Sequence, residues 1–172
     1  MPGLLIGPAS AGAQQFEKPG LYRVDAVGWI QSKIPGGGEV FACSRCEFPV
    51  QIRFTYSVPS DPTMPFQSNE EFLQTLATGS AQRRFARSII EDQVPENTPI
   101  DITKTSVSEL GGLMMFRFHA VTKLGLTLSR KTMWIAIHRN RILMVALSYF
   151  EDGLDKPSRN QIRAFFTSIE FL

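Results

Sequence analysis

The fold of this chain is decided by residues 113–150, which read LMMFRFHAVTKLGLTLSRKTMWIAIHRNRILMVALSYF. Three apolar runs, rich in aromatic and β-branched residues, span residues 113–123, 128–138 and 141–150, with short turns between them. The first run alternates apolar and polar side chains, which is the period of a strand with one buried face. The third run is apolar at both even and odd positions over residues 142–147, as expected of a strand covered on both faces. The stretch therefore predicts an antiparallel meander.

Side chains of the first run divide between two faces. The apolar face is expected to carry Met114, Phe116, Phe118 and Ala120, and the polar face Arg117, His119 and Lys123. A hairpin turn at residues 124–126 would place His119 opposite Lys131. The next turn is predicted at Arg139 and Asn140, because Asn tolerates the positive φ that a two-residue hairpin loop requires.

Further elements are expected on both sides of the meander. Extended segments are predicted at residues 21–29, 39–42, 50–58 and 100–107. Ser68 begins a capping box that opens a helical region over residues 68–90, interrupted at Gly79. A closing helix is expected over residues 156–168, with Asp155 as its N-cap.

Together these elements predict an α+β fold, an antiparallel β-sheet meander flanked by helices. Residues expected in the core are apolar and lie at inward-facing positions of these strands and of the closing helix. They are Ile52, Phe54, Phe116, Phe118, Ile135, Val145, Leu147, Ile162 and Phe165.

Composition narrows the function classes. The chain has 172 residues, 43% of them hydrophobic and 20% charged, which suits one ordinary globular domain. Its formal net charge of +2 is only mildly basic, and no Lys/Arg stripe interleaved with aromatic residues is present, so nucleic-acid binding is not expected. No apolar run approaches the roughly 20 residues that cross a bilayer, so no membrane span is expected.

Residues 1–13, MPGLLIGPASAGA, are apolar and end in small residues. Ala11 and Ala13 suit a signal peptidase site, with Gln14 as the first mature residue. A complete signal peptide also has a basic n-region and a longer apolar core, and neither is present. The stretch is either a truncated signal peptide or a chance Ala/Gly-rich tail. The first interpretation is favoured and implies a periplasmic or secreted protein.

Cys43 and Cys46 are the two cysteines of the chain. Residues i and i+3 of a β-turn lie within about 7 Å, which overlaps the Cα separation of a disulfide. In an oxidising compartment the pair is therefore expected to form a structural disulfide. A thioredoxin-like redox site is the alternative, but such a site needs a helix after the motif, whereas Pro49 and a strand follow. Zinc needs about four ligands, and this pair supplies only half.

Other side chains suggest no catalytic site. His119 and His138 are expected to lie too far apart to share a metal, and to be solvated. No serine lies in a nucleophile elbow, and no Gly-rich loop leads from a strand into a helix. Glu151 and Asp152 are expected in a solvated turn. The sequence thus predicts no enzyme activity, cofactor or metal site.

Arg83, Arg84 and Arg87 form the densest basic cluster of the chain. On a helix their spacing places Arg87 beside the other two side chains. Such a cluster is either a solvated helix face or a docking patch for an acidic surface of a protein partner. The docking patch is the candidate partner-binding site that the sequence offers.

The order of elements resembles that of a PsbP-like domain, an α/β/α sandwich named for an extrinsic photosystem II subunit. The features that carry the resemblance are the helix start at residues 68–77, the turn at Gly111 and Gly112, residues 134–150 and residues 162–171. The resemblance covers residues 50–172 and leaves residues 14–49 as a lead-in with the cysteine pair. It implies a family whose members mostly bind other proteins and mostly lack an active site.

Three hypotheses about function follow. The first is an exported, non-enzymatic domain that binds a protein partner and has a structural disulfide. The second is an exported thiol–disulfide protein that uses Cys43 and Cys46. The third is a secretion chaperone or immunity-type binder of the same fold, which would be cytoplasmic if it is a chaperone.

Overall fold

The computed structural model describes residues 14–57, 65–150 and 154–172. Its elements are, in chain order, β1 (Gln15–Lys18), β2 (Tyr22–Asp25), β3 (Trp29–Lys33), β4 (Glu39–Cys43), β5 (Val50–Tyr56), α1 (Asn69–Thr75), α2 (Gly79–Glu91), β6 (Ile100–Leu110), β7 (Leu113–Leu124), β8 (Thr127–His138), β9 (Arg141–Tyr149), α3 (Lys156–Ser168) and β10 (Glu170–Phe171). The predicted signal segment at residues 1–13 and the predicted turn at residues 151–152 lie outside the described residues.

Seven strands form one antiparallel sheet in the order β3-β4-β5-β9-β8-β7-β6. The predicted meander, β7 to β9, lies in this sheet, and β6 joins it through a turn at Gly111 and Gly112. β9 also pairs with β5, with Val50 opposite Tyr149 at one end and Tyr56 opposite Leu143 at the other. A second sheet contains β1, β2 and β10. The predicted α+β class is thus confirmed.

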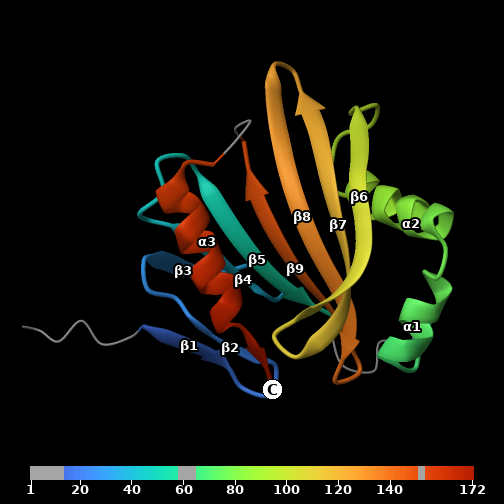
Figure 1. Ribbon diagram of the computed structural model, residues 1–172, viewed down its shortest axis with the longest axis horizontal. Coiled ribbons are helices and arrows are strands. Elements are labelled where there is room, and N and C mark those ends of the chain that lie inside the picture. Colours follow the sequence, from blue (N-terminus) through green and yellow to red (C-terminus); the bar gives the residue numbers. More distant parts are fainter. Residues whose placement is uncertain (1–13, 58–64, 151–153) are drawn as a thin grey trace, which may run out of the picture.

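The large sheet is the middle layer of a sandwich (Figure 1). On one face, α1 and α2 lie over the end of the sheet formed by β6, β7 and β8. On the other face, α3 and the small sheet lie over the end formed by β3, β4, β5 and β9. Each face is therefore covered over one half only.

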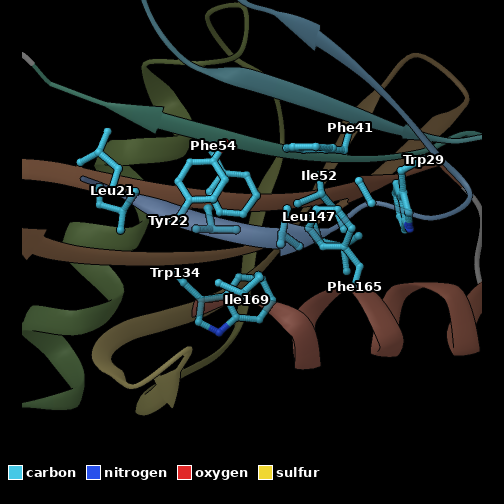
Figure 2. Close-up of a cluster of buried hydrophobic side chains, with 14 of the residues drawn as sticks. Leu21, Tyr22, Trp29, Phe41, Ile52, Phe54, Trp134, Leu147, Phe165 and Ile169 are labelled. Atoms are coloured by element: carbon cyan, nitrogen blue, oxygen red, sulfur yellow. The ribbon is translucent and has the colours of Figure 1, made fainter. Parts of the chain in front are cut away.

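The core under α3 and the small sheet is aromatic (Figure 2). Phe165 of α3 is 1% exposed, and its ring centroid lies 4.9 Å from that of Trp29 and 5.1 Å from that of Phe41. Tyr22 of the small sheet stacks on Phe54 of β5 at 4.1 Å. These contacts hold α3 and the small sheet against the large one.

The core under α1 and α2 is separate from the first. Its buried residues come from both helices, β7 and β8: Phe72, Leu76, Ala86, Ile90, Phe116, Phe118, Ala120, Met133, Ile135 and Ile137. Of the residues predicted from the sequence to form the core, all are buried except Ile162, which is partly buried. Successive residues of β9 contact opposite cores: Val145 and Leu147 lie in the first core, and Met144 and Ala146 pack against the second.

Local signals in the sequence are reproduced in detail. Arg139 and Asn140 have φ values of 51° and 56°, as the two-residue turn requires. The Ser68 hydroxyl accepts a hydrogen bond from the backbone N–H of Glu71 at 3.1 Å, and Asp155 caps α3 in the same way. These signals act within a few residues, so they do not depend on the rest of the fold.

Other local predictions are wrong. Met114 is not on a buried face: it is 45% exposed, because it pairs with Glu109 next to the Gly111 turn, outside both cores. The helical region over residues 68–90 is two helices, and the break comes before Gly79. Thr78 begins the second helix, since its hydroxyl accepts a hydrogen bond from the N–H of Ala81 at 3.2 Å.

Residues 14–49, separated in the sequence as a lead-in, contribute β1 to β4. β4 pairs with β5 of the large sheet, and β2 pairs with the C-terminal β10. The single strand predicted over residues 21–29 is two strands in different sheets, divided at Gly28, whose φ of 82° favours glycine. Such pairings join distant residues, so the alternation of the lead-in alone did not reveal them.

Candidate functional site

The cysteine pair forms a disulfide with a Cα–Cα distance of 5.6 Å. Cys43 is the last residue of β4, and the turn that contains Cys46 leads into β5. Both cysteines pack against the aromatic core, and Ser44 donates two hydrogen bonds to the carbonyl of Gly28. The element that follows is a strand, so the pair lacks the helix N-terminus that activates thioredoxin-like thiols. This geometry is that of a cross-link within a turn.

The arginine cluster on α2 is exposed, as the sequence suggests. Arg87 donates a hydrogen bond to the carbonyl of Ile100 at 3.0 Å and lies 3.8 Å from the carboxylate of Glu91. Arg87 therefore helps to hold α2 against β6. Arg83 and Arg84 remain as an exposed pair on the helix, and binding by them stays a prediction.

The histidines lie in different places and are more enclosed than predicted. His119 faces Thr132 rather than Lys131, because Gly125 and Leu126 make the hairpin turn and shift the pairing by one residue. Its Nδ1 lies 2.9 Å from the Thr132 hydroxyl, and His138 Nε2 lies 2.9 Å from the carbonyl of Leu172. Within the part of the chain that the structure describes, no group of three His, Cys, Asp or Glu residues could hold a metal ion.

A groove of about 450 Å³ runs between α3 and the strands that α3 leaves uncovered. We call it the basic groove and define it by Arg117, Thr132, Trp134, Arg159, Arg163 and Phe166. The strands β7 and β8 supply the first three side chains and α3 supplies the others. Arg159 and Arg163 are four residues apart, so they lie on the same side of the helix.

Aromatic side chains form the inner wall of the basic groove. The rings of Trp134 and Phe166 lie 4.6 Å apart, and the Arg117 guanidinium lies over the Trp134 ring at 5.2 Å from its centroid. Leu154, Ile162 and Phe166 are only partly buried. The groove thus offers apolar surface beside cationic groups.

Charge in the basic groove is unbalanced. Among the described lining residues, three arginines accompany one carboxylate, that of Glu109. Burial, then the positive charges of Arg117 and Lys104, lower the pKa of His119, which is bonded to the groove residue Thr132. The Arg117 Nε and the Ser108 hydroxyl are buried without a hydrogen-bond partner in the described structure.

A buried carboxylate lies elsewhere, between the two sheets. Glu39 is 2% exposed and accepts hydrogen bonds from the hydroxyls of Tyr22 at 2.7 Å and Tyr56 at 3.0 Å, with Lys18 Nζ at 3.2 Å. Burial and the bond to Glu39 raise the pKa of Tyr22, and the hydrogen bond with Tyr56 is the main cause that raises the pKa of Lys18. Because protein groups occupy this carboxylate, it serves to join β1 and β2 to β4 and β5.

The sequence pattern predicts neither the basic groove nor the Glu39 cluster. The groove arginines come from β7 and α3, far apart in the chain, and looked like separate solvated residues. Glu39 looked like an ordinary acid at the start of a strand. A signal for the groove does exist, since Arg159 and Arg163 share one side of a helix whose other side is apolar.

Comparison with known proteins supports the fold. No family model and no curated protein sequence matches the chain. The cyanobacterial PsbP protein of Synechocystis, CyanoP, has a solution structure with a TM-score of 0.63 and 18% identity, and the match covers 99% of this chain and 98% of that one. LpqN of Mycobacterium tuberculosis, described as involved in cell envelope biogenesis, gives a TM-score of 0.51 at 11% identity, over 93% of this chain and 91% of LpqN.

A third similar structure is a protein of Bacteroides thetaiotaomicron, with a TM-score of 0.58 and 11% identity. The match covers 93% of this chain, which spans about half of that protein (48%). No helix in the described part of the chain is long and apolar enough to cross a membrane. The match to CyanoP includes residues 14–49 as well as residues 50–172. At identities this low, the similarity is evidence for the fold alone. The chain has the PsbP-like fold.

Proposed function

We propose that this protein is an exported, non-enzymatic accessory domain whose basic groove binds an acidic segment of a protein partner. The observation that carries the proposal is the grouping of three arginines and one carboxylate around a partly exposed apolar wall. Arginine and aromatic side chains are the residues most enriched where proteins bind one another tightly.

An acidic segment fits the groove better than a purely apolar one. The Arg117 guanidinium is partly exposed and lies over the Trp134 ring in the groove, and a carboxylate of the partner would pair with its charge. Arg159 and Arg163 are exposed on α3 and would attract acidic residues over a longer range. Phe166 would contact an apolar side chain within the same segment.

Export is supported by two observations. The disulfide between Cys43 and Cys46 is of the kind that persists in oxidising compartments. Residues 1–13 have the small-residue pattern of a cleavage site. Cell fractionation with N-terminal sequencing of the mature protein tests this part: export predicts Gln14 as the first residue, and an intact protein in the cytoplasm would contradict it.

The binding part is tested with synthetic peptides that differ in acidic content and contain one Phe. The double change Arg159→Glu, Arg163→Glu should weaken binding of the acidic peptide at least about tenfold, because two attractive contacts become repulsive. The matched control is Lys33→Glu, Arg45→Glu, which makes the same change of charge at exposed positions outside the groove and should leave binding within about twofold.

NMR of the two histidines locates the bound peptide. Carboxylates in the groove would offset the charges of Arg117 and Lys104, so the pKa of His119 should rise on binding. The ring signals of His138, which lies at the C-terminal end of β8 outside the basic groove, should keep their chemical shifts. Equal loss of binding in both double variants would overturn the proposal, and so would a pKa of His119 that does not change when the peptide binds.

A further inference from the structure

A second pocket, of about 200 Å³, lies on the opposite face of the large sheet from the basic groove. Its polar lining consists of Gln51, Arg53, Gln93, Ser129, Lys131 and Ser148. Five of these residues lie on the adjacent strands β5, β9 and β8, and Gln93 comes from the segment after α2. None of these residues belongs to the groove.

Strand register explains why these side chains meet. Gln51 pairs with Ser148, and Ser148 pairs with Lys131, so the three form one row across adjacent strands. Neighbouring strands are about 4.8 Å apart, so the ends of the row are within reach of one ligand. Arg53 is two residues from Gln51 along β5 and therefore projects from the same face. Beside it, the small side chain of Ala146 leaves the floor of the pocket open.

The charged side chains described in this pocket are all positive. Arg53 and Lys131 are its cations, and no Asp or Glu is among its described lining residues. The Lys131 ammonium donates a hydrogen bond to Gln93 Oε1 at 3.0 Å, which holds it beside the amide of that residue. Burial, then the charge of Arg53, lower the pKa of Lys131. Two cations are thus held together without a neutralising partner in the part of the pocket described.

We propose that this pocket binds a small oxyanion, a carboxylate or a phosphate, between Arg53 and Lys131. An ammonium and a guanidinium together suit the several acceptor oxygens of such a group. The hydroxyl of Ser129, which is 6% exposed, and the amide of Gln51 add neutral donors. Pro49 and the half-exposed Phe150 form an apolar wall that would contact the body of an organic acid.

The test uses the full chain, titrated separately with inorganic phosphate and with benzoate at constant ionic strength. The ε-methylene signals of the lysines report the site, because a bound anion should raise the pKa of Lys131 toward its ordinary value. Stronger binding of phosphate would identify a phosphate site, and stronger binding of benzoate with shifts at Phe150 would identify an organic carboxylate. Either result supports the proposal.

Matched variants decide whether the pocket is responsible. Lys131→Met and Arg53→Gln should each weaken binding at least about tenfold, since each removes a charged donor. Lys33→Met and Arg84→Gln remove the same charges from exposed positions elsewhere and should leave binding within about twofold. Arg53 is exposed, so its variant keeps the test valid if Lys131→Met does not fold.

Two results would overturn the proposal. One is the absence of any shift at Lys131 with both anions at millimolar concentration. The other is an equal effect of the pocket and control variants, which would show only general attraction of anions to a basic protein. Because the probes are small anions and the variants lie outside the basic groove, neither result bears on the binding of an acidic segment there.

Discussion

The two faces of the large sheet are covered on opposite halves, and the difference shows where binding can occur (Figure 1). Strand β8 displays it most clearly. From Met133 to Ile137 both faces of β8 carry buried apolar side chains, because a layer lies on each side. From Ser129 to Thr132 the residues are polar on both faces.

The two candidate sites therefore lie back to back across one stretch of β8. Thr132 faces the basic groove, and the adjacent Lys131 faces the oxyanion pocket. The covered half of the strand supplies stability, while the polar half supplies side chains that line the two candidate sites. Substitutions on each half should consequently have very different costs.

Loss of an aromatic ring from either core should have the largest effect. Phe165→Ala and Phe116→Ala remove rings that are 1% and 0% exposed, one from each face, and each should lower the free energy of unfolding by about 3–5 kcal/mol. Denaturant unfolding measures both. Phe150→Ala, at a position 50% exposed, is the control. A loss below about 1 kcal/mol for one core variant would show that this face is not packed as described.

Glu39→Ala should lower the free energy of unfolding by about 3 kcal/mol, since the buried Tyr22 hydroxyl, the partly buried Tyr56 hydroxyl and the Lys18 ammonium lose their acceptor. Glu39→Gln retains an acceptor oxygen and should recover part of this loss. Thermal and denaturant unfolding compare the two variants. Equal stability of Glu39→Ala and the unaltered protein would mean that the small sheet is held by apolar contacts alone.

Removal of the disulfide by Cys43→Ser, Cys46→Ser should lower stability by about 2 kcal/mol, because it closes only a short loop in the unfolded chain. Acidic-peptide binding should be unaffected, since the pair lies away from the basic groove. The equilibrium potential against glutathione should be strongly reducing. An oxidising potential together with turnover of a model disulfide would instead favour the thiol–disulfide hypothesis.

Alkaline pH should weaken the Glu39 cluster, which joins the small sheet to the large one. The pKa values of Tyr22 and Lys18 are raised in the folded protein, so the stability from both groups is complete below about pH 10 and falls as the pH rises further. Tyr22→Phe should lose about 1.5 kcal/mol at pH 8 and show a shallower decline above pH 10. Melting temperatures across this range measure both slopes, and parallel slopes would contradict the role of Tyr22.

The smallest effect is expected on the open halves of the sheet. Arg163→Gln in the basic groove and Arg53→Gln in the oxyanion pocket change exposed side chains and should alter stability by less than about 0.5 kcal/mol. Melting temperatures are sufficient to detect a larger change. A loss above about 1 kcal/mol would assign either arginine to the structure rather than to binding.

Sequence alone determined the elements whose causes are local. The alternation in β5 and β7, the caps at Ser68 and Asp155, and the turn at Arg139 all depend on residues within a few positions of one another. The cysteine spacing also belongs here, because residues i and i+3 of a turn are close in any fold. Element order was then sufficient to indicate the PsbP-like fold.

Tertiary structure alone decided which distant elements meet. The pairing of β5 with β9 and of β2 with β10 joins strands that a one-dimensional pattern treats as independent. The layers that result cover only half of each face, and this determines whether a polar residue such as Lys131 or Arg117 lines a pocket or lies in solvent. Glu39 became a buried contact for the same reason, since its partners come from three other strands.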